Sequence, residues 1–194
     1  MSFLTETQGS SPGLLIRLYD DHQNLASVLE AFEHQCRALE IAEEPDCYLL
    51  RDILDYVQSF PDTIHHPAED LLFDYMLRNV RLSDREQKAI ADNRDQHEEL
   101  SEATRTLLRM IDTRFDKGLV DSAALSLMMS LFLSEYRRHM EFEDRYLFPL
   151  AEARLSKADW NAVENQLLQG DDPLFEAYEE QYEFLRGYIE VQYR

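Results

Sequence analysis

Apolar residues recur every three or four positions along most of the chain, which is the spacing of one face of an α-helix. The first such stretch begins at Leu14 and ends before Pro45, because proline disfavours helical geometry in the residue that precedes it. Its apolar face consists of Leu18, Leu25, Leu29, Phe32, Cys36 and Leu39. We therefore expect one long helix here.

A second helical stretch runs from about residue 47 to residue 79. Asp46 precedes it and can accept a hydrogen bond from a backbone N–H that has no partner within the helix. Pro61 and Pro67 lie inside this stretch, where each removes a backbone donor and crowds the preceding turn. We expect these prolines to break or kink the helix.

A third helix is expected to open at Ser83 and Glu86, which have the spacing of a capping box, and to last until the Lys117-Gly118 pair. The fourth runs from about residue 121 to residue 154. Four long helices joined by short connections predict an all-α fold, an up-down-up-down four-helix bundle over residues 13–154.

Residues 155–194 form a C-terminal extension in which we expect two additional short helices. Ser156 caps the first, which contains Trp160 and ends at Gly170, while Pro173 suits the first position of the second. One side of this second helix is apolar and comprises Leu174, Phe175, Tyr178, Tyr182, Leu185 and Ile189. The extension either docks on the bundle or joins two chains in a homodimer, and the pattern does not choose between these arrangements.

The chain carries 39 acidic and 19 basic side chains, a formal net charge of −20. Phosphates would be repelled, which argues against nucleic acid or an anionic membrane surface as a partner. Residues 1–12 are polar, are expected to be flexible and lack the basic and apolar regions of a signal peptide. The two cysteines, Cys36 and Cys47, indicate no disulfide framework, so we expect a cytoplasmic protein.

An internal repeat links two pairs of short motifs. LYDDHQNL at residues 18–25 aligns with NRDQHEEL at 93–100, and HHPAED at 65–70 aligns with HMEFED at 139–144. The offsets are 75 and 74 positions. Each half of the chain therefore contributes a lone histidine and then a His-x-x-x-Glu motif.

The four histidines of the repeat, His22, His65, His97 and His139, are expected to lie at one level of the bundle. In an up-down-up-down bundle, residues equidistant from a turn face each other. The midpoints between successive histidines fall at the expected turns. Each histidine also shares a helix face with apolar residues, so we expect all four imidazoles to point inward.

His65 with Glu69, and His139 with Glu143, have the i, i+4 spacing that presents a ring nitrogen and a carboxylate oxygen to one point. Buried together, these groups need compensation, and divalent cations provide it because imidazole suits iron, zinc and copper while carboxylates bridge two ions. Six protein ligands are too many for one tetrahedral zinc and few for two octahedral ions. This count predicts a two-metal centre with open or water-filled positions, and we favour two iron ions over zinc or manganese.

These motifs, with HMEFEDRYLFPL from residue 139, resemble the hemerythrin-like, or HHE cation-binding, family of bacteria over about residues 14–154. The resemblance implies a four-helix bundle holding a non-haem di-iron centre with an oxo or hydroxo bridge. Carried over by position, it implies the metal ligands His22, His65, Glu69, His97, His139 and Glu143, with the two glutamates bridging.

Two departures from the family pattern concern the ligands. Oxygen-carrying members have a second histidine one helical turn from the residue that matches His97, where this chain has Asn93 or Ser101. One iron is therefore expected to bind water or another group instead. Such four-histidine, two-glutamate sites resemble the bacterial repair-of-iron-centres proteins, although the cysteine-bearing N-terminal domain of those proteins has no counterpart here.

Neighbouring registers compete with this ligand set. His66 with Asp70 repeats the i, i+4 spacing, and Asp144 lies five residues after His139. The repeat favours His65 over His66, because no histidine follows His139. We expect His66 to be supporting or exposed, and Asp70 and Asp144 to orient ligands or face solvent.

A histidine-rich centre has fewer anionic ligands than ferritin-type sites, which should stabilise ferrous iron and disfavour strongly oxidising states. We therefore expect the protein to bind a small diatomic ligand, O₂ or NO, in sensing, storage or a stress response. An enzymatic alternative is peroxide or NO breakdown, or iron donation to damaged iron-sulfur centres, with a tyrosine such as Tyr19, Tyr75, Tyr136 or Tyr146 assisting. A third alternative is an interaction module that holds a metal for stability.

Overall fold

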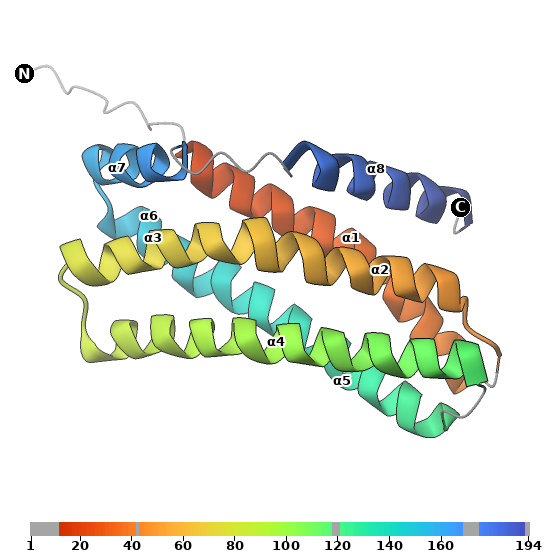
Figure 1. Cartoon of the computed structure of the whole chain (residues 1–194). Helices are drawn as coiled ribbons and strands as arrows, with labels where there is room; N and C mark the ends of the chain where they lie inside the picture. Colours follow the sequence, from red (N-terminus) through yellow and green to blue (C-terminus); the bar gives the residue numbers. More distant parts are fainter. Residues whose placement is uncertain (1–11, 42, 118–120, 169–174, 193–194) are drawn as a thin grey trace, which may run out of the picture.

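The computed structural model describes residues 12–41, 43–117, 121–168 and 175–192. All regular elements in these ranges are helices (Figure 1). They are α1 (Gly13–Glu40), α2 (Cys47–Phe60), the π-helical turn η1 (Pro61–His65), α3 (His66–Asn79), α4 (Asp84–Lys117), α5 (Ser122–Phe142), the π-helical turn η2 (Glu143–Leu147), α6 (Phe148–Arg154), α7 (Lys157–Leu168) and α8 (Phe175–Gln192).

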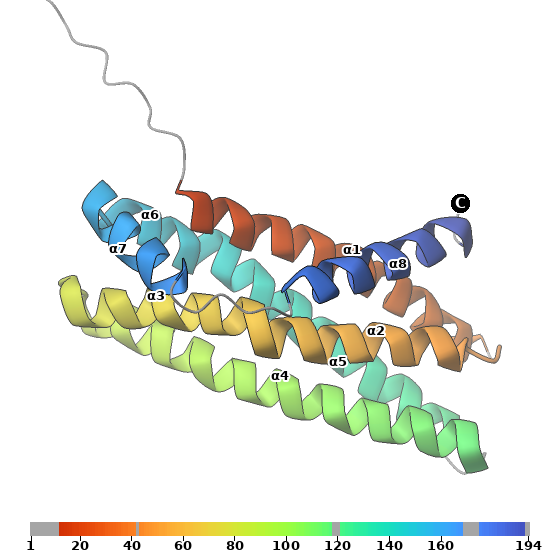
Figure 2. The same ribbon diagram turned by 45° about the horizontal axis from the view of Figure 1, so that its top comes forward.

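Four helical segments form the bundle. In chain order they are α1, the continuous run α2–η1–α3, then α4, and the continuous run α5–η2–α6, and each reverses the direction of the one before it (Figures 1 and 2). The all-α, up-down-up-down arrangement predicted from the apolar periodicity is therefore confirmed.

The predicted helix starts carry the predicted caps. The Asp46 Oδ1 accepts a hydrogen bond from the Leu49 backbone N–H at 3.0 Å at the start of α2. At the start of α4, the Ser83 N–H donates to Glu86 Oε2 at 2.6 Å and the Glu86 N–H donates to Ser83 Oγ at 3.3 Å. This reciprocal pair satisfies two backbone donors that the helix itself leaves unpaired.

Pro61 and Pro67 do not break the second segment. α2 continues through η1 into α3, and the His66 N–H donates to the Pro61 carbonyl across the wider π-helical turn. A π turn shifts the hydrogen-bond ladder by one residue, which accommodates prolines whose nitrogens cannot donate. Of the predicted break or kink, the break does not occur, and the disturbance of the helix takes the form of this turn. A matching turn, η2, precedes Pro149.

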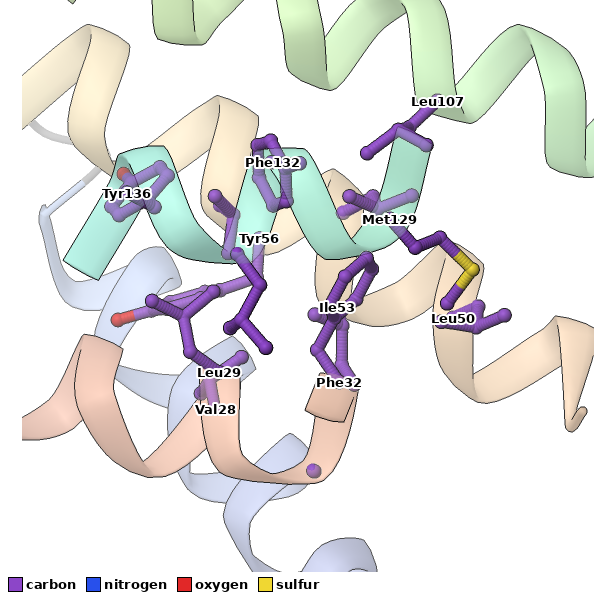
Figure 3. Close-up of a cluster of buried hydrophobic side chains, with 14 of the residues drawn as sticks. Val28, Leu29, Phe32, Leu50, Ile53, Tyr56, Leu107, Met129, Phe132 and Tyr136 are labelled. Carbon is purple, nitrogen blue, oxygen red and sulfur yellow. The ribbon is translucent and has the colours of Figure 1, made fainter. Parts of the chain in front are cut away.

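Buried apolar side chains form two clusters along the bundle, and the histidine motifs lie between them. The first cluster contains Val28, Leu29, Phe32, Leu50, Ile53, Tyr56, Leu107, Met129, Phe132 and Tyr136 (Figure 3). The second lies toward the α3–α4 and α6–α7 connections and contains Leu15, Leu18, Leu72, Phe73, Met76, Ile90, Leu147 and Phe148. Polar residues at the intervening level are thus enclosed by an apolar layer on each side.

The C-terminal extension packs on the bundle in the described ranges. Ser156 caps α7, as predicted, in a reciprocal pair with Asp159, and Trp160 is buried in the second cluster. α8 lies along α1 and α2, with Leu185 buried in the first cluster (Figure 1). The predicted stops at Gly118 and Gly170, the predicted start at Pro173 and the side chains of Leu174, Phe175 and Tyr178 lie outside the described residues. No helix in the described ranges is long and apolar enough to cross a membrane.

Candidate metal centre

The structure brings together all of the side chains that the sequence nominated as metal ligands. They come from the four segments of the bundle and are buried between the two apolar clusters: His22, His65, Glu69, His97, His139 and Glu143. The common level expected for the four histidines is therefore what the structure shows.

The two π turns carry part of this constellation. His65 is the last residue of η1, and Glu143 is the first residue of η2. A π turn holds more residues than an α turn, so it changes which side chains face the interior at that height. Such turns occur often at functional sites, which agrees with their position here.

The histidines form two pairs. The rings of His22 and His65 have centroids 4.8 Å apart, and those of His97 and His139 have centroids 4.9 Å apart. His22, His65 and Glu69 offer donor atoms that lie within 4.8 Å of one another, and so do Glu69, His97 and Glu143. The site therefore has two adjoining halves.

Each glutamate contacts histidines of both halves. Glu69 Oε1 lies 3.3 Å from His65 Nε2, and its other oxygen, Oε2, lies 3.4 Å from His97 Nε2. Glu143 Oε2 lies 3.3 Å from both His22 Nε2 and His139 Nε2, while Oε1 lies 3.4 Å from His97 Nε2. Both carboxylates thus have the position of a bridge between the halves.

These atoms are placed as ligands of a metal ion rather than as hydrogen-bond partners of one another. Buried polar atoms are normally hydrogen-bonded. Six buried candidate ligand atoms have no hydrogen bond within the described residues: His22 Nε2, His65 Nε2, Glu69 Oε1, Glu69 Oε2, His139 Nε2 and Glu143 Oε2. Two ligands about 2.1 Å from one ion and at right angles lie about 3.0 Å apart, close to the nitrogen–oxygen separations observed here. Imidazole and carboxylate together suit iron, zinc or manganese.

Three of the four outward ring nitrogens have an acceptor within hydrogen-bond distance. Asp144 Oδ1 lies 2.7 Å from His22 Nδ1, Asp21 Oδ2 lies 3.1 Å from His65 Nδ1, and Gln96 Oε1 lies 3.2 Å from His139 Nδ1. His97 Nδ1 has no hydrogen-bond partner in the described residues, and the Asp70 Oδ1 lies 3.7 Å from it. An acceptor at Nδ1 places the proton there and leaves the Nε2 lone pair facing the centre, the usual construction around a metal-binding histidine.

Sequence reasoning expected Asp70 and Asp144 to orient ligands or face solvent, and it missed Asp21 and Gln96. Asp21 is adjacent to His22, so it lies on the neighbouring face of α1 and reaches a histidine of a different segment, His65. Gln96 likewise precedes His97 and reaches His139. The repeat itself held this signal, since a polar residue precedes the lone histidine in each half.

Protonation of the metal-free site reflects its crowding. Burial lowers the pKa of His22, but the adjacent Asp144 and Glu143 carboxylates outweigh it and raise the pKa to about 9. Burial also lowers the pKa of His65, but the Glu69 and Asp21 carboxylates outweigh it and raise the pKa to about 10. For His139, burial dominates and lowers the pKa to about 4. A cation that binds the Nε2 atoms of the first pair must therefore displace protons.

The glutamates differ from each other in the metal-free site. Burial raises the pKa of Glu143, but His139, His22 and His97 outweigh it and hold the pKa well below its usual value. Burial and the adjacent Glu143 carboxylate raise the pKa of Glu69. Two carboxylates enclosed at this depth repel each other, and cations between them would remove that repulsion.

Two further buried residues border the half formed by His97 and His139. His66 is only 6 % exposed, which excludes the exposed position that the sequence allowed for it. Asn93, one turn before His97, is fully buried, and its Nδ2 donates to Glu143 Oε1 at 2.9 Å. Asn93, one of the two positions with Ser101 that the sequence offered for a further histidine, thus holds the Glu143 carboxylate through its amide.

Cavities reach the centre from two directions. One of about 390 Å³ is lined by Tyr19, His22, Gln23, Ala26, Arg137, Met140, Glu141, Asp144 and Arg145. The other, of about 260 Å³ and mostly apolar, is lined by Gln96, Glu99, Leu100, Ala103, Leu107, Met128, Leu131, Phe132, Glu135 and His139. Each half of the site therefore has a histidine on the wall of a cavity large enough for a small molecule.

Comparison with known proteins agrees with this geometry. The family described as the hemerythrin HHE cation binding domain matches residues 14–155, which span all four segments of the bundle and all of the clustered histidines and glutamates. No match was found among curated proteins or among solved structures. The chain belongs to the hemerythrin HHE cation-binding family, and the clustered histidines and glutamates make it a helical metal-binding domain.

Proposed function

We propose that the protein binds two iron ions and uses them to bind a small diatomic ligand, O₂ or NO. In this proposal His22 and His65 hold one ion, His97 and His139 hold the other, and Glu69 and Glu143 bridge them. The observation that carries the proposal is the pair of glutamates, each of which faces histidines of both halves.

The donor set favours iron and a mild chemistry. Two carboxylates compensate half of the charge of two ferrous ions and a smaller share at higher oxidation states, which favours the ferrous state over highly oxidised ones. Ferrous iron with neutral imidazole ligands is suited to bind O₂ or NO. The iron would supply the ligand-binding electrons, while the protein would hold the ions apart from water and orient the imidazoles through their Nδ1 acceptors.

One observation supports the enzymatic alternative, in which the centre breaks down peroxide or NO or donates iron. The Tyr136 hydroxyl is buried and has no hydrogen bond in the described residues, and its ring lies 6.4 Å from that of His139. Such a phenol could donate a proton to a group bound at the centre. The other tyrosines considered lie differently: Tyr75, for example, donates to Asp159 on α7 at 2.8 Å.

The proposal is tested by loading the metal-free protein anaerobically with ferrous iron and then adding NO or O₂. We expect two iron ions per chain and a new visible absorption with each gas, and we expect neither in a His139→Ala variant. A matched control is His34→Ala, because His34 is an exposed histidine on α1. Bound zinc with no response to either gas would instead support a structural metal, and sustained turnover of peroxide or NO would support an enzyme.

Two expectations from the sequence stay predictions. A homodimer through the C-terminal helices would use α8, whose outer side exposes Phe184 and Val191. Light scattering of the wild type and of Phe184→Asp at matched concentrations tests the homodimer, and equal monomer masses for both proteins would contradict it.

The cytoplasmic location also stays a prediction.

A further inference from the structure

We propose that the cavity of about 260 Å³ between α4 and α5 binds a small molecule with an apolar chain and a cationic, ammonium-type head. This site is separate from the iron chemistry proposed above, because binding there requires the cavity wall and no metal ion. Three observations support it: the apolar wall of the cavity, the carboxylates at one end of it, and the lack of basic side chains among the described residues that line it.

Most of the cavity wall is apolar. The apolar lining consists of Leu100, Ala103 and Leu107 on α4 and of Met128, Leu131 and Phe132 on α5. Leu131 is 51 % exposed, and Leu127, one helical turn before it, is 60 % exposed. Large apolar side chains in contact with water beside a cavity are typical of a surface that takes up an apolar ligand. The lining therefore suits an apolar chain.

The polar residues of the wall gather at one end. Gln96 Oε1 lies 3.2 Å from His139 Nδ1, so these two positions face each other across α4 and α5. The two helices run in opposite directions, which brings Glu99 of α4 and Glu135 of α5 to the same end (Figure 1). Leu107 lies eight positions beyond Glu99, about 12 Å along the helix axis. The cavity thus has a polar end and an apolar end.

The charges at the polar end favour a cation. Glu99 and Glu135 are the acidic residues of the wall, and no lysine or arginine lines it within the described ranges. The Glu99 carboxylate has no hydrogen bond or ion pair in the described part of the chain, while Glu135 pairs with Arg138, whose side chain is 68 % exposed. The wall therefore carries a negative charge that lacks a partner, and the net charge of −20 adds to the attraction for a cation.

Other head groups suit this end less well. Both glutamates would repel a carboxylate or a phosphate, and a hydroxyl would leave the Glu99 charge uncompensated. An ammonium group has three N–H donors and a compact charge, so it can pair with a glutamate while its chain continues along the apolar wall toward Leu107. The ligand class is therefore a primary amine with an alkyl or aryl chain.

The test is calorimetric titration of the full chain with four probes: n-hexylammonium, n-hexanol, hexanoate and methylammonium. We expect saturable binding of n-hexylammonium, about two- to fivefold tighter than that of n-hexanol, because an ion pair open to solvent adds about this much affinity. Hexanoate should bind more weakly than n-hexanol. Methylammonium has the charge without the chain, and since each buried methylene adds about fourfold in affinity, it should show no saturable binding.

Two variants test whether binding occurs in this cavity. Ala103→Trp fills it and should remove the binding of n-hexylammonium and of n-hexanol, whereas Ala26→Trp fills part of the other cavity and should leave both unchanged. Replacing both carboxylates in Glu99→Gln with Glu135→Gln should remove the preference for the ammonium and keep the binding of n-hexanol. Both glutamates are exposed, so this second variant is expected to keep the fold, which helical circular dichroism checks for each protein.

The matched control for charge is Asp92→Asn with Glu98→Gln. These two acids are exposed on α4 and lie outside the cavity wall. The control changes the net charge by the same amount, so it should keep the preference for n-hexylammonium over n-hexanol. A loss of the preference in this control would assign it to the overall charge of the chain and overturn the inference.

The other outcomes that overturn the inference concern the cavity alone. They are n-hexanol or methylammonium binding as tightly as n-hexylammonium, an ammonium preference that survives in Glu99→Gln with Glu135→Gln, and wild-type binding by a folded Ala103→Trp protein. Each of these leaves the proposed function standing, because uptake of two ferrous ions and the response to NO are measured separately. Failure of the chain to bind iron would likewise leave this site intact.

Discussion

Asp144 Oδ1 lies 2.7 Å from His22 Nδ1, which joins the end of the fourth bundle segment to the middle of the first across 122 positions of sequence. The contact fixes the ring and directs its other nitrogen toward Glu143. We expect Asp144→Asn to weaken metal binding by about 10- to 100-fold, because an acceptor at the outer nitrogen is replaced by a weaker, neutral one. Competition with a chromogenic chelator measures the change.

The control for that substitution is Asp92→Asn. Asp92 lies on α4 and pairs with Lys88 at 2.6 Å on the surface. It should leave metal affinity unchanged, and equal effects of the two variants would show that the contact between Asp144 and His22 has no role in binding.

We expect a small ligand to reach the centre through the cavity at His22, the larger of the two cavities described above. Ala26→Trp fills part of this cavity, and we expect it to slow the association of NO with the ferrous protein while leaving the metal content unchanged. Ala103→Trp fills the apolar cavity at His139 in the same way and should leave the rate unchanged. Stopped-flow mixing gives both rates, and a slower rate only in Ala103→Trp would place the ligand on the opposite side.

The buried Tyr136 hydroxyl predicts an unusual response to its removal. A buried hydroxyl without a partner costs roughly 1–3 kcal/mol, so Tyr136→Phe should leave the unfolding free energy of the metal-free protein unchanged or raise it by about 1 kcal/mol. Tyr75→Phe is the matched comparison, because it removes the hydrogen bond to Asp159 and should lower stability. Urea denaturation measures both, and a clear loss in Tyr136→Phe would mean that its hydroxyl has a partner.

Docking of α8 should contribute to stability and not to the site. Leu185 is buried in the first apolar cluster, so Leu185→Ala should lower the unfolding free energy by about 2 kcal/mol or more. Metal content should stay the same, because the ligands proposed here lie on other elements. Phe184→Ala, at an adjacent position 74 % exposed, should change stability by less than about 0.5 kcal/mol. Loss of metal from Leu185→Ala would show that the extension supports the centre.

The two cysteines should differ in reactivity. Burial raises the pKa of the Cys36 thiol to about 12, so the reactive thiolate is absent from the folded protein at pH 8. Since the thiol of the unfolded chain ionises near pH 8.5, Cys36 favours folding below that pH, and this contribution declines as pH rises toward 12. Mass spectrometry after labelling at pH 8 should find Cys36 modified only when urea is present; labelling of native Cys36 would contradict this.

Sequence reasoning succeeded where a single helix or a repeat carries the signal. The apolar spacing predicts the helices, and the caps at Asp46 and Ser83 follow from local hydrogen bonding. The repeat predicts a common level for four histidines, because short turns and helix geometry fix heights without knowledge of packing.

What the sequence did not predict depends on contacts between segments or on an irregular turn. Asp21 contacts His65, 44 positions away; the repeat marks a polar residue before each lone histidine but does not reveal which histidine that residue contacts. The burial of His66 follows from η1, and a proline-containing stretch predicts disturbance without specifying a π turn. The repeat favoured His65 over His66 because no histidine follows His139, and it left an exposed position open for His66, which the structure buries.

The two apolar clusters flank the histidine level from both sides. Each cluster ties the four segments together by itself, so the polypeptide can reach its final shape with empty ligand positions, unlike small zinc domains that collapse only around their ion. A cation can then enter and leave a bundle that is already folded, and exchange of the cation requires the opening of a short path to the centre rather than unfolding.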